Sequence, residues 1–321
     1  MMRSKPLVRP PQLRPGSRIG LLAPAGPLLE RDDLTRAQEL CRALGYEPVL
    51  GANAYNRYGY LAGTDDDRLA DLNQSLQDPA INAIWCIRGG YGALRLLERV
   101  DYDAITRHPK ALVGFSDITA LLNAVTRISG VVTYHGPVAR ASMPEFSRRH
   151  FQRVLASPEA PGRLGRIPLA ADVLVPRDNR IVTLCGGSAE GPLAGGNLSL
   201  LQCLIGSPYF PDLQGAILFL EDAGEDLYRV DRMLAHLRMV GAFRQLAGVV
   251  VGHFTELERA GRDGALGFDE VLSTYFEPLG IPVAYGFPIG HIECQWTLPL
   301  GVIARLDAGA GELELLEPAV V

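Results

Sequence analysis

Short apolar runs of strand length alternate with longer segments in which apolar residues recur at helical spacing. Four such runs, bounded by Gly or Pro, occupy the first part of the chain, and the helix-spaced segments lie between them. This alternation is typical of βαβ units, in which a parallel sheet is covered by helices on both faces. The predicted strands are 18–24, 81–87, 111–115 and 131–135, and the predicted helices are 31–45, 64–78, 92–100 and 117–130.

The alternation weakens between about residues 140 and 190, where we expect one helix and then an irregular stretch rich in Pro, Gly and Arg. A second block of apolar runs and helix-spaced segments follows, and the last part of the chain alternates like an antiparallel hairpin. We therefore predict an α/β protein with an N-terminal parallel-sheet domain (1–145), a connecting segment (146–180) and a C-terminal mixed α/β domain (181–321). In the second block the predicted helices are 195–208, 226–243 and 268–280, and the predicted strands are 215–222, 246–254 and 281–291.

Composition excludes several classes of protein. The 321 residues carry a formal net charge of -5 and no long basic run, which disfavours nucleic-acid binding. The 5 cysteines form neither a CxxC pair nor a cluster with histidine, so we expect neither a disulfide framework nor a metal site. No apolar stretch approaches the roughly 18 residues of a membrane span. The proline-rich start lacks the apolar region of a signal peptide, so we expect a loose or surface-running N-terminal arm and a cytoplasmic protein.

A serine stands where a predicted strand turns into a predicted helix, in "PKALVGFSDITALLNAV" (109–125). At this position the first-turn amides of the helix point outward, and the positive end of the helix dipole favours an oxyanion. The turn differs from the G-x-S-x-G elbow of α/β-hydrolases, since residue 118 is Ile. Ser116 is therefore a candidate nucleophile, and a plain helix N-cap is the alternative.

A glycine pair follows the predicted strand at 81–87, in "RGGYG" (88–92). Glycines allow backbone paths closed to other residues, and ligand sites form at the carboxyl ends of parallel strands. Bare amides at this turn could donate to an oxyanion or to a phosphate, or the segment could be a simple turn into the next helix. It is not a G-x-G-x-x-G sequence, which gives little support to a dinucleotide site.

The apolar run "GAILFLED" (215–222) ends in two carboxylates, Glu221 and Asp222. In serine hydrolases a carboxylate fixes the tautomer and the orientation of the catalytic imidazole. Either residue could have this role in the present chain. The alternative is a solvated strand end or a helix cap.

Three histidines end apolar runs and are candidate bases. His291 closes "GFPIGH" (286–291), and His135 and His253 are its rivals. A structural role is the alternative for each. Because Ser116, Glu221 and His291 each close an apolar strand, in the order Ser, acid, His, we predict that they form a hydrolytic triad.

Several motifs resemble the LD-carboxypeptidase family, the serine peptidases of murein recycling, whose relatives include microcin-immunity hydrolases. The resemblance spans about residues 16–308 and implies a Ser-Glu-His triad at Ser116, Glu221 and His291. It implies an oxyanion hole formed by backbone amides at Gly90 and Asp117. It also implies a nucleophile domain followed by a domain that carries Glu221 and His291, a homodimer, and neither metal nor other cofactor. The motifs are "WCIRGGYGALRLL", "ALVGFSDITALL", "TYHGPV", "LAGGNLSLL", "LFLEDAGEDLYRVDRML" and "GFPIGH".

The family resemblance implies release of the terminal D-alanine from cytoplasmic murein tetrapeptides, by cleavage of an L-to-D amide bond at meso-diaminopimelate. Arg88 is the candidate cation for the substrate carboxylate, with an internal ion pair as the alternative. Asn197 could contact substrate or only cap a helix.

Two other functions remain open. Microcin-immunity relatives cleave an amide in a peptidyl or aminoacyl nucleotide. The segment 180–193 has no tryptophan to stack on a nucleobase, which favours the muropeptide. A non-enzymatic binder of sugars or amino acids is the third reading, disfavoured by the expected absence of a signal peptide.

Overall fold

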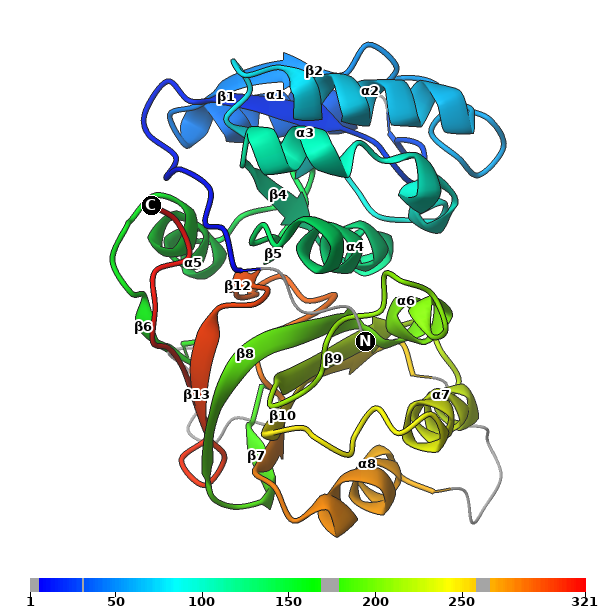
Figure 1. The fold of residues 1–321 in the computed structure, drawn as a ribbon, viewed down its shortest axis with the longest axis vertical. Coiled ribbons are helices and arrows are strands. Elements are labelled where there is room, and N and C mark those ends of the chain that lie inside the picture. The colour runs from blue at the N-terminus through cyan, green and yellow to red at the C-terminus, as the bar shows by residue number, and fades with distance from the viewer. Residues whose placement is uncertain (1–5, 31, 169–178, 258–265) are drawn as a thin grey trace.

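The computed structural model describes residues 6–30, 32–168, 179–257 and 266–321, so part of the predicted connecting segment, 169–178, lies outside the described residues. Within them the strands form two sheets, one in each half of the molecule (Figure 1). Five neighbouring strands of the first sheet are parallel, and a short sixth strand from late in the chain pairs antiparallel at its edge. In spatial order its strands are β12 (Leu298–Pro299), β5 (Tyr134–His135), β4 (Ala111–Gly114), β3 (Ala83–Cys86), β1 (Arg18–Leu22) and β2 (Glu47–Leu50).

The centre of the first sheet is apolar on both faces. Every residue of β3 and β4 is buried, as expected for parallel strands that are covered by the helices connecting them. The second connecting helix begins at a capping box in which Thr64 accepts from the amide of Asp67 and the Asp67 carboxylate accepts from the amide of Thr64. The helices of this half are α1 (Asp33–Ala43), α2 (Asp65–Gln77), η1 (Ala93–Arg99), α3 (Tyr102–Arg107), η2 (Ser116–Ile118), α4 (Thr119–Ser129) and α5 (Glu145–Leu155).

The second sheet is mixed. Four central strands are parallel, and antiparallel strands flank them on both sides. In spatial order they are β6 (Gly162–Leu164), β14 (Glu312–Leu315), β13 (Ile303–Asp307), β8 (Ser188–Asn197), β9 (Ile217–Ala223), β10 (Gly248–Thr255), β11 (Val283–Tyr285) and β7 (Val182–Cys185). Its helices are α6 (Leu198–Leu204), α7 (Leu227–Met239), α8 (Phe268–Phe276) and η3 (Glu277–Leu279).

Helix α4 joins the two halves. It lies between the sheets, above β8 and α6 in Figure 1, and its residues 119–125 are all buried. The side-chain amide of Asn123 donates to the carbonyl of Gly195 in β8 (3.0 Å), and the backbone amide of Asn197 donates to Thr119 Oγ1 (3.1 Å). The helix that starts beside Ser116 is therefore fixed to the strand that precedes α6 in the other half.

The two-part α/β architecture confirms the predicted fold class, and the late hairpin is present as β13 and β14. Some local predictions were wrong. The expected α-helix at 92–100 is the 3-10 helix η1, and the run at 131–135 keeps only the two residues of β5 as strand. β2 was missed because it is an edge strand of half-buried and exposed residues without a continuous apolar run.

Over its described part the proline-rich start runs along the protein and is bonded to it, as the surface-running alternative predicts and the loose one does not. The amide of Val8 donates to the carbonyl of Gly130, and the amide of Leu13, itself buried, donates to the carbonyl of Leu155. Proline-rich sequence is compatible with an extended, anchored segment as well as with a free one, since proline fixes φ and removes only its own donor. The residue limits predicted for the domains remain predictions.

Candidate active site

Ser116 occupies a strained turn at the carboxyl end of β4. Its φ of 63° lies in the left-handed region, which is unusual for a residue other than glycine. The Ser116 hydroxyl lies 3.0 Å from His291 Nε2 and makes no capping bond to either η2 or α4. The simple N-cap alternative is therefore wrong. In this conformation the hydroxyl faces His291, which comes from the second half of the molecule.

Glu221 and His291 come from the second half and complete a hydrogen-bonded chain. Glu221 lies near the carboxyl end of β9 and is fully buried, and its Oε2 is 2.8 Å from His291 Nδ1. His291 retains 29% side-chain exposure. Gly290 has a φ of 113°, and a Cβ at this position would lie 2.9 Å from Glu221 Cβ. Only glycine lets the backbone pass this close to the carboxylate, which explains the glycine before His291.

The pKa shifts of Glu221 and His291 fit a base that is oriented by a buried acid. Burial raises the pKa of Glu221 above its usual range, against the opposing effect of the hydrogen bond with His291. Burial also disfavours protonated His291, but the hydrogen bond and the charge of Glu221 outweigh it and raise the pKa of His291 above its ordinary value. A neutral imidazole with Nδ1 protonated would present Nε2 to the Ser116 hydroxyl as a proton acceptor.

The two rival histidines have other surroundings. His135 is buried edge-on between the rings of Phe115 and Phe219, and burial lowers the pKa of His135 to about 3. It is therefore a neutral packing group at neutral pH. The backbone amide of His253 donates to the carbonyl of Ile289 (2.8 Å), which anchors the loop that presents His291.

The glycine turn after β3 lies directly against Ser116. A Cβ on Gly89 would approach Ser116 Cβ to 2.9 Å, Ser116 Oγ to 3.1 Å and the backbone nitrogen of Asp117 to 3.3 Å. Gly90, the next residue, is exposed and has a φ of 112°. The glycine turn that includes Gly90 thus packs against Ser116 and against the first-turn amide of Asp117, an amide of the kind that lacks a partner within its helix.

Two side chains that sequence analysis missed hold this arrangement. The buried carboxylate of Asp117 accepts a hydrogen bond from the amide of Ala93 (2.8 Å), and burial raises the pKa of Asp117 to about 6. The buried Arg68 donates to the carbonyls of Pro24 (2.6 Å) and Gly92 (2.9 Å). In the sequence, Arg68 follows three aspartates and reads as part of a solvated helix face, so no local signal marks it.

The two tentative substrate residues differ in position. Arg88 donates to the carbonyl of Pro27, and no salt bridge of Arg88 is found among the described residues, although the charge of Asp33 opposes the lowering of its pKa by burial. Asn197 is 3% exposed. Its side chain caps α6 by accepting from the amide of Leu200 and donates to Asp222 Oδ1 (2.8 Å). The asparagine therefore uses both of its side-chain functions inside the protein.

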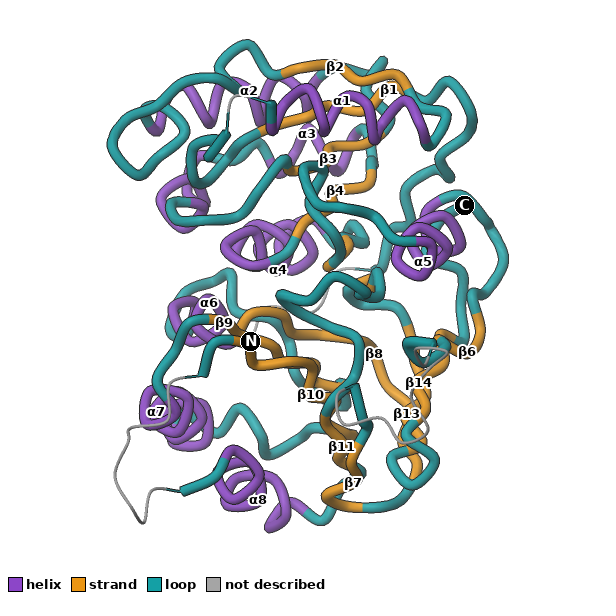
Figure 2. Tube along the Cα trace, turned by 180° about the vertical axis from the view of Figure 1, so that it is seen from behind, coloured by secondary structure: helices purple, strands orange, loops and turns teal. Residues whose placement is uncertain are grey.

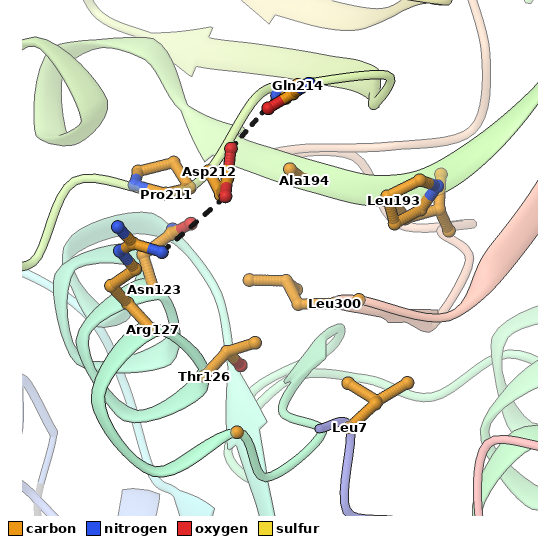
Figure 3. Close-up of a pocket in the computed structure, with 13 residues that line it drawn as sticks. Leu7, Asn123, Thr126, Arg127, Leu193, Ala194, Pro211, Asp212, Gln214 and Leu300 are labelled. Atoms are coloured by element: carbon orange, nitrogen blue, oxygen red, sulfur yellow. Dashed lines mark hydrogen bonds and ion pairs between the residues drawn. The ribbon is translucent and has the colours of Figure 1, made fainter. Parts of the chain in front are cut away.

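A separate cavity of about 270 Å³ lies at the junction of the two halves, beside α4 and β8 (Figure 3). Arg127 and Asp212 form an ion pair on its wall (3.7 Å). None of the three residues of the hydrogen-bonded chain lines it, so it is not the candidate active site. Its lining includes Leu7, Asn123, Thr126, Leu193, Ala194 and Leu300.

Over the part of the chain that the structure describes, no three His, Cys, Asp or Glu residues are grouped to hold a metal ion. No helix in the same part combines the length and the hydrophobicity needed to cross a membrane.

Comparison with known proteins identifies relatives along the whole chain. Residues 19–136 match the LD-carboxypeptidase N-terminal domain, and residues 190–306 match the LD-carboxypeptidase C-terminal domain. The murein tetrapeptide carboxypeptidase of Pseudomonas aeruginosa is 35% identical over 300 residues, which cover 90% of this chain and 93% of the relative. The microcin C7 self-immunity protein MccF of Escherichia coli is 28% identical over 339 residues, covering 99% and 98% of the two chains.

Solved structures give the same relationship. Muramoyltetrapeptide carboxypeptidase from Oxalobacter formigenes superposes with a TM-score of 0.78 at 31% identity, covering 93% of this chain and 98% of that one. Wild-type MccF without ligand superposes with a TM-score of 0.88 at 26% identity, covering 98% and 100%.

Proposed function

Because the chain belongs to the LD-carboxypeptidase family, we propose that it is a serine carboxypeptidase that releases the terminal D-alanine from murein tetrapeptides by cleaving an L-to-D amide bond. The observation that carries the proposal is the hydrogen-bonded chain from Ser116 Oγ to His291 (3.0 Å) and from His291 to Glu221 (2.8 Å). Nucleophile, base and orienting acid are the three groups that acyl transfer through serine requires.

In the first half of the proposed reaction, Ser116 Oγ attacks the carbonyl carbon while His291 Nε2 takes the hydroxyl proton. Glu221 stabilises the imidazolium that forms. The amides of Gly90 and Asp117 donate to the tetrahedral oxyanion, each lowering the barrier by about 3 kcal/mol. His291 then gives its proton to the amide nitrogen, the C–N bond breaks, and D-alanine leaves.

In the second half, water attacks the acyl-enzyme ester and gives its proton to His291. The oxyanion re-forms in the same amide site and collapses, the C–O bond to Ser116 breaks, and the proton returns to the serine. The shortened peptide leaves with a new carboxylate. Arg88, beside the glycine turn, is the proposed cation for a substrate carboxylate.

An amidase that acts on peptidyl or aminoacyl nucleotides is the second candidate function. The TM-score of 0.88 to MccF favours it, whereas the 35% identity to a murein tetrapeptide carboxypeptidase favours the first. We retain the murein peptide as the proposed substrate because residues 180–193, which hold β7 and the start of β8, carry no tryptophan for stacking on a nucleobase.

The same family relationship supports a homodimer that works in the cytoplasm, within peptidoglycan recycling. Sedimentation of the purified protein tests the assembly, and fractionation of cells tests the location. A monomer at micromolar concentration would contradict the first, and secreted protein the second.

A substrate panel tests the proposed function. Wild-type protein is incubated with a murein tetrapeptide and, separately, with an aminoacyl nucleotide, and the products are separated by mass spectrometry. We expect D-alanine from the tetrapeptide and a far slower reaction of the nucleotide. Ser116→Ala should lower kcat by at least about 10⁴-fold with an unchanged melting temperature. Preferential cleavage of the nucleotide would favour the amidase, and retained turnover by Ser116→Ala would reject Ser116 as the nucleophile.

A further inference from the structure

Arg88 and Arg140 lie side by side at the carboxyl end of β3, which Figure 2 shows between β1 and β4. The backbone amide of Arg140 donates to the carbonyl of Ile87 (3.2 Å), the residue before Arg88. Burial lowers the pKa of Arg88, and the charge of Arg140 lowers it further, as expected for two neighbouring cations.

The Arg88 guanidinium lies against the glycine turn that holds Gly90. A Cβ placed on Gly26 would lie 3.4 Å from Arg88 Cζ, and one placed on Gly90 would lie 3.4 Å from Arg88 Nη2. The guanidinium therefore contacts the same turn whose neighbouring residue, Gly89, packs against Ser116.

The two arginines carry more positive charge than the carboxylates around them balance. Arg88 bonds to a backbone carbonyl, that of Pro27. Arg140 Nη1 lies 3.8 Å from Asp33 Oδ1, and that same oxygen accepts from Arg36 (3.0 Å). Arg36 also pairs with Glu30 and Asp32, whereas Asp33 is, among the described residues, the one buried carboxylate whose charge acts on both Arg140 and Arg88.

Both guanidinium groups also keep an unused donor. The Nε atoms of Arg88 and Arg140 are buried, and neither has a hydrogen-bond partner. A buried donor without a partner destabilises the protein, and a guanidinium edge matches the two oxygens of a carboxylate. The geometry and the excess charge therefore both favour an anionic, planar ligand.

We propose that Arg88 and Arg140 together form the carboxylate-binding site of the substrate cleft, with Arg140 as a specificity-determining residue. This inference rests on the proposed function. Two carboxylates on the residues that flank the scissile bond have the required chemistry, namely the terminal carboxylate of D-alanine and the side-chain carboxylate of diaminopimelate.

Binding to the protein with Ser116→Ala tests the site without catalysis. Calorimetry compares three tetrapeptides: one that ends in L-Lys-D-Ala as a free acid, the same peptide as a C-terminal carboxamide, and one with diaminopimelate in place of lysine. We expect at least one carboxylate to increase affinity about 10-fold or more, and Arg140→Gln to abolish that gain. Arg140→Lys should retain part of it. Arg148→Gln, at an exposed position on α5, removes the same charge and should retain all of it.

Comparing the affinities of the three peptides identifies which carboxylate binds at Arg140. If Arg140 recognises the terminal carboxylate, Arg140→Gln equalises acid and carboxamide. If it recognises diaminopimelate, the variant equalises diaminopimelate and lysine. The proposal is overturned if acid, carboxamide and diaminopimelate peptides bind alike to protein with Arg140 intact, or if Arg140→Gln weakens all three equally.

The same data separate this inference from the proposed function. Turnover by the wild-type protein is measured on the three peptides in parallel. Arg140-dependent binding without release of D-alanine would reject the carboxypeptidase and keep the carboxylate site. Release of D-alanine without any effect of Arg140→Gln on KM would keep the carboxypeptidase and reject the site.

Discussion

At the scale of single residues, the central feature is a buried acid that raises the basicity of a half-exposed imidazole. Glu221 is fully buried, and its Oε2 lies at hydrogen-bond distance from His291 Nδ1. His291 must be neutral to accept the proton of Ser116, and Glu221 raises the pKa of His291 above its ordinary value. The pH dependence of the reaction therefore reports on this pair directly.

We predict that kcat/KM falls as the pH drops through the pKa of His291, which Glu221 raises above its ordinary value, because protonated His291 is not a base. Glu221→Gln removes the charge that raises the pKa of His291. The acid limb of the pH profile of kcat/KM should therefore move to lower pH. The maximal rate should also fall on the order of 10³–10⁴-fold. Steady-state kinetics between pH 5 and 9 measure both. Glu190→Gln, at an exposed position on β8, is the matched control. An acid limb that does not move in Glu221→Gln would contradict the role assigned to Glu221.

A second residue-scale prediction concerns the space beside Ser116. Gly89→Ala places a methyl group 3.1 Å from Ser116 Oγ and 3.3 Å from the amide nitrogen of Asp117. We expect kcat/KM to fall about 10²-fold or more, because the hydroxyl or the oxyanion donors must shift. Gly186→Ala adds the same group in open space and should leave kcat/KM within twofold of wild type. Circular dichroism checks folding, and near-normal activity of Gly89→Ala would refute this geometry.

At the scale of elements, the strand ends were predictable and the contacts between them were not. Apolar runs that end in Ser116, Glu221 and His291 are local patterns, and parallel strands present their carboxyl ends at one edge. The bonds of Asp117 to Ala93 and of Arg68 to Gly92 join segments 24 residues apart. Nothing in the local pattern distinguishes these charged residues from solvated ones, so only the folded chain shows that they hold the glycine turn.

The burial of Asp117 against the glycine turn can be tested through the pH dependence of the free energy of unfolding. Burial raises its pKa from 3.8 to about 6, so the folded state favours the protonated form. Stability from this group is present at low pH and is lost as the pH rises through about 6. At 1.36 kcal/mol per pH unit, the loss is at most about 3 kcal/mol.

We therefore expect wild-type protein to lose unfolding free energy relative to Asp117→Asn between pH 4 and 7, because asparagine does not ionise. Urea unfolding at several pH values measures the difference. Asp103→Asn, at an exposed position of α3, is the control whose difference from wild type should stay level. If the difference in unfolding free energy between wild type and Asp117→Asn also stayed constant with pH, burial would not raise the pKa of Asp117.

At the scale of the whole molecule, the chain crosses between its halves more than once. β12 comes from late in the chain and pairs with β5 in the first sheet. The last residues also return to this sheet, where the hydroxyl of buried Tyr134 donates to the carbonyl of Ala319 (2.7 Å). Short strands and single bonds of this kind carry no periodic signal, which is why the sequence predicts two blocks but not the way they interlock.

Tyr134→Phe tests this long-range connection. It removes one buried hydrogen bond and leaves the carbonyl of Ala319 without its donor, so the unfolding free energy should fall by about 1–2 kcal/mol. Tyr55→Phe, at a position 68% exposed, should change it by no more than about 0.5 kcal/mol. Equal effects of the two variants in urea unfolding would show that the bond contributes nothing to stability.

The most direct test of the account is covalent labelling of the proposed nucleophile. Wild-type protein is treated with a fluorophosphonate, digested and mapped by mass spectrometry, in parallel with Ser116→Ala and His291→Ala. We predict a single adduct on the peptide that contains Ser116, its absence in Ser116→Ala, much slower labelling of His291→Ala, and loss of D-alanine release in proportion to labelling. An adduct on a different serine, or full activity in protein fully labelled at Ser116, would contradict the account.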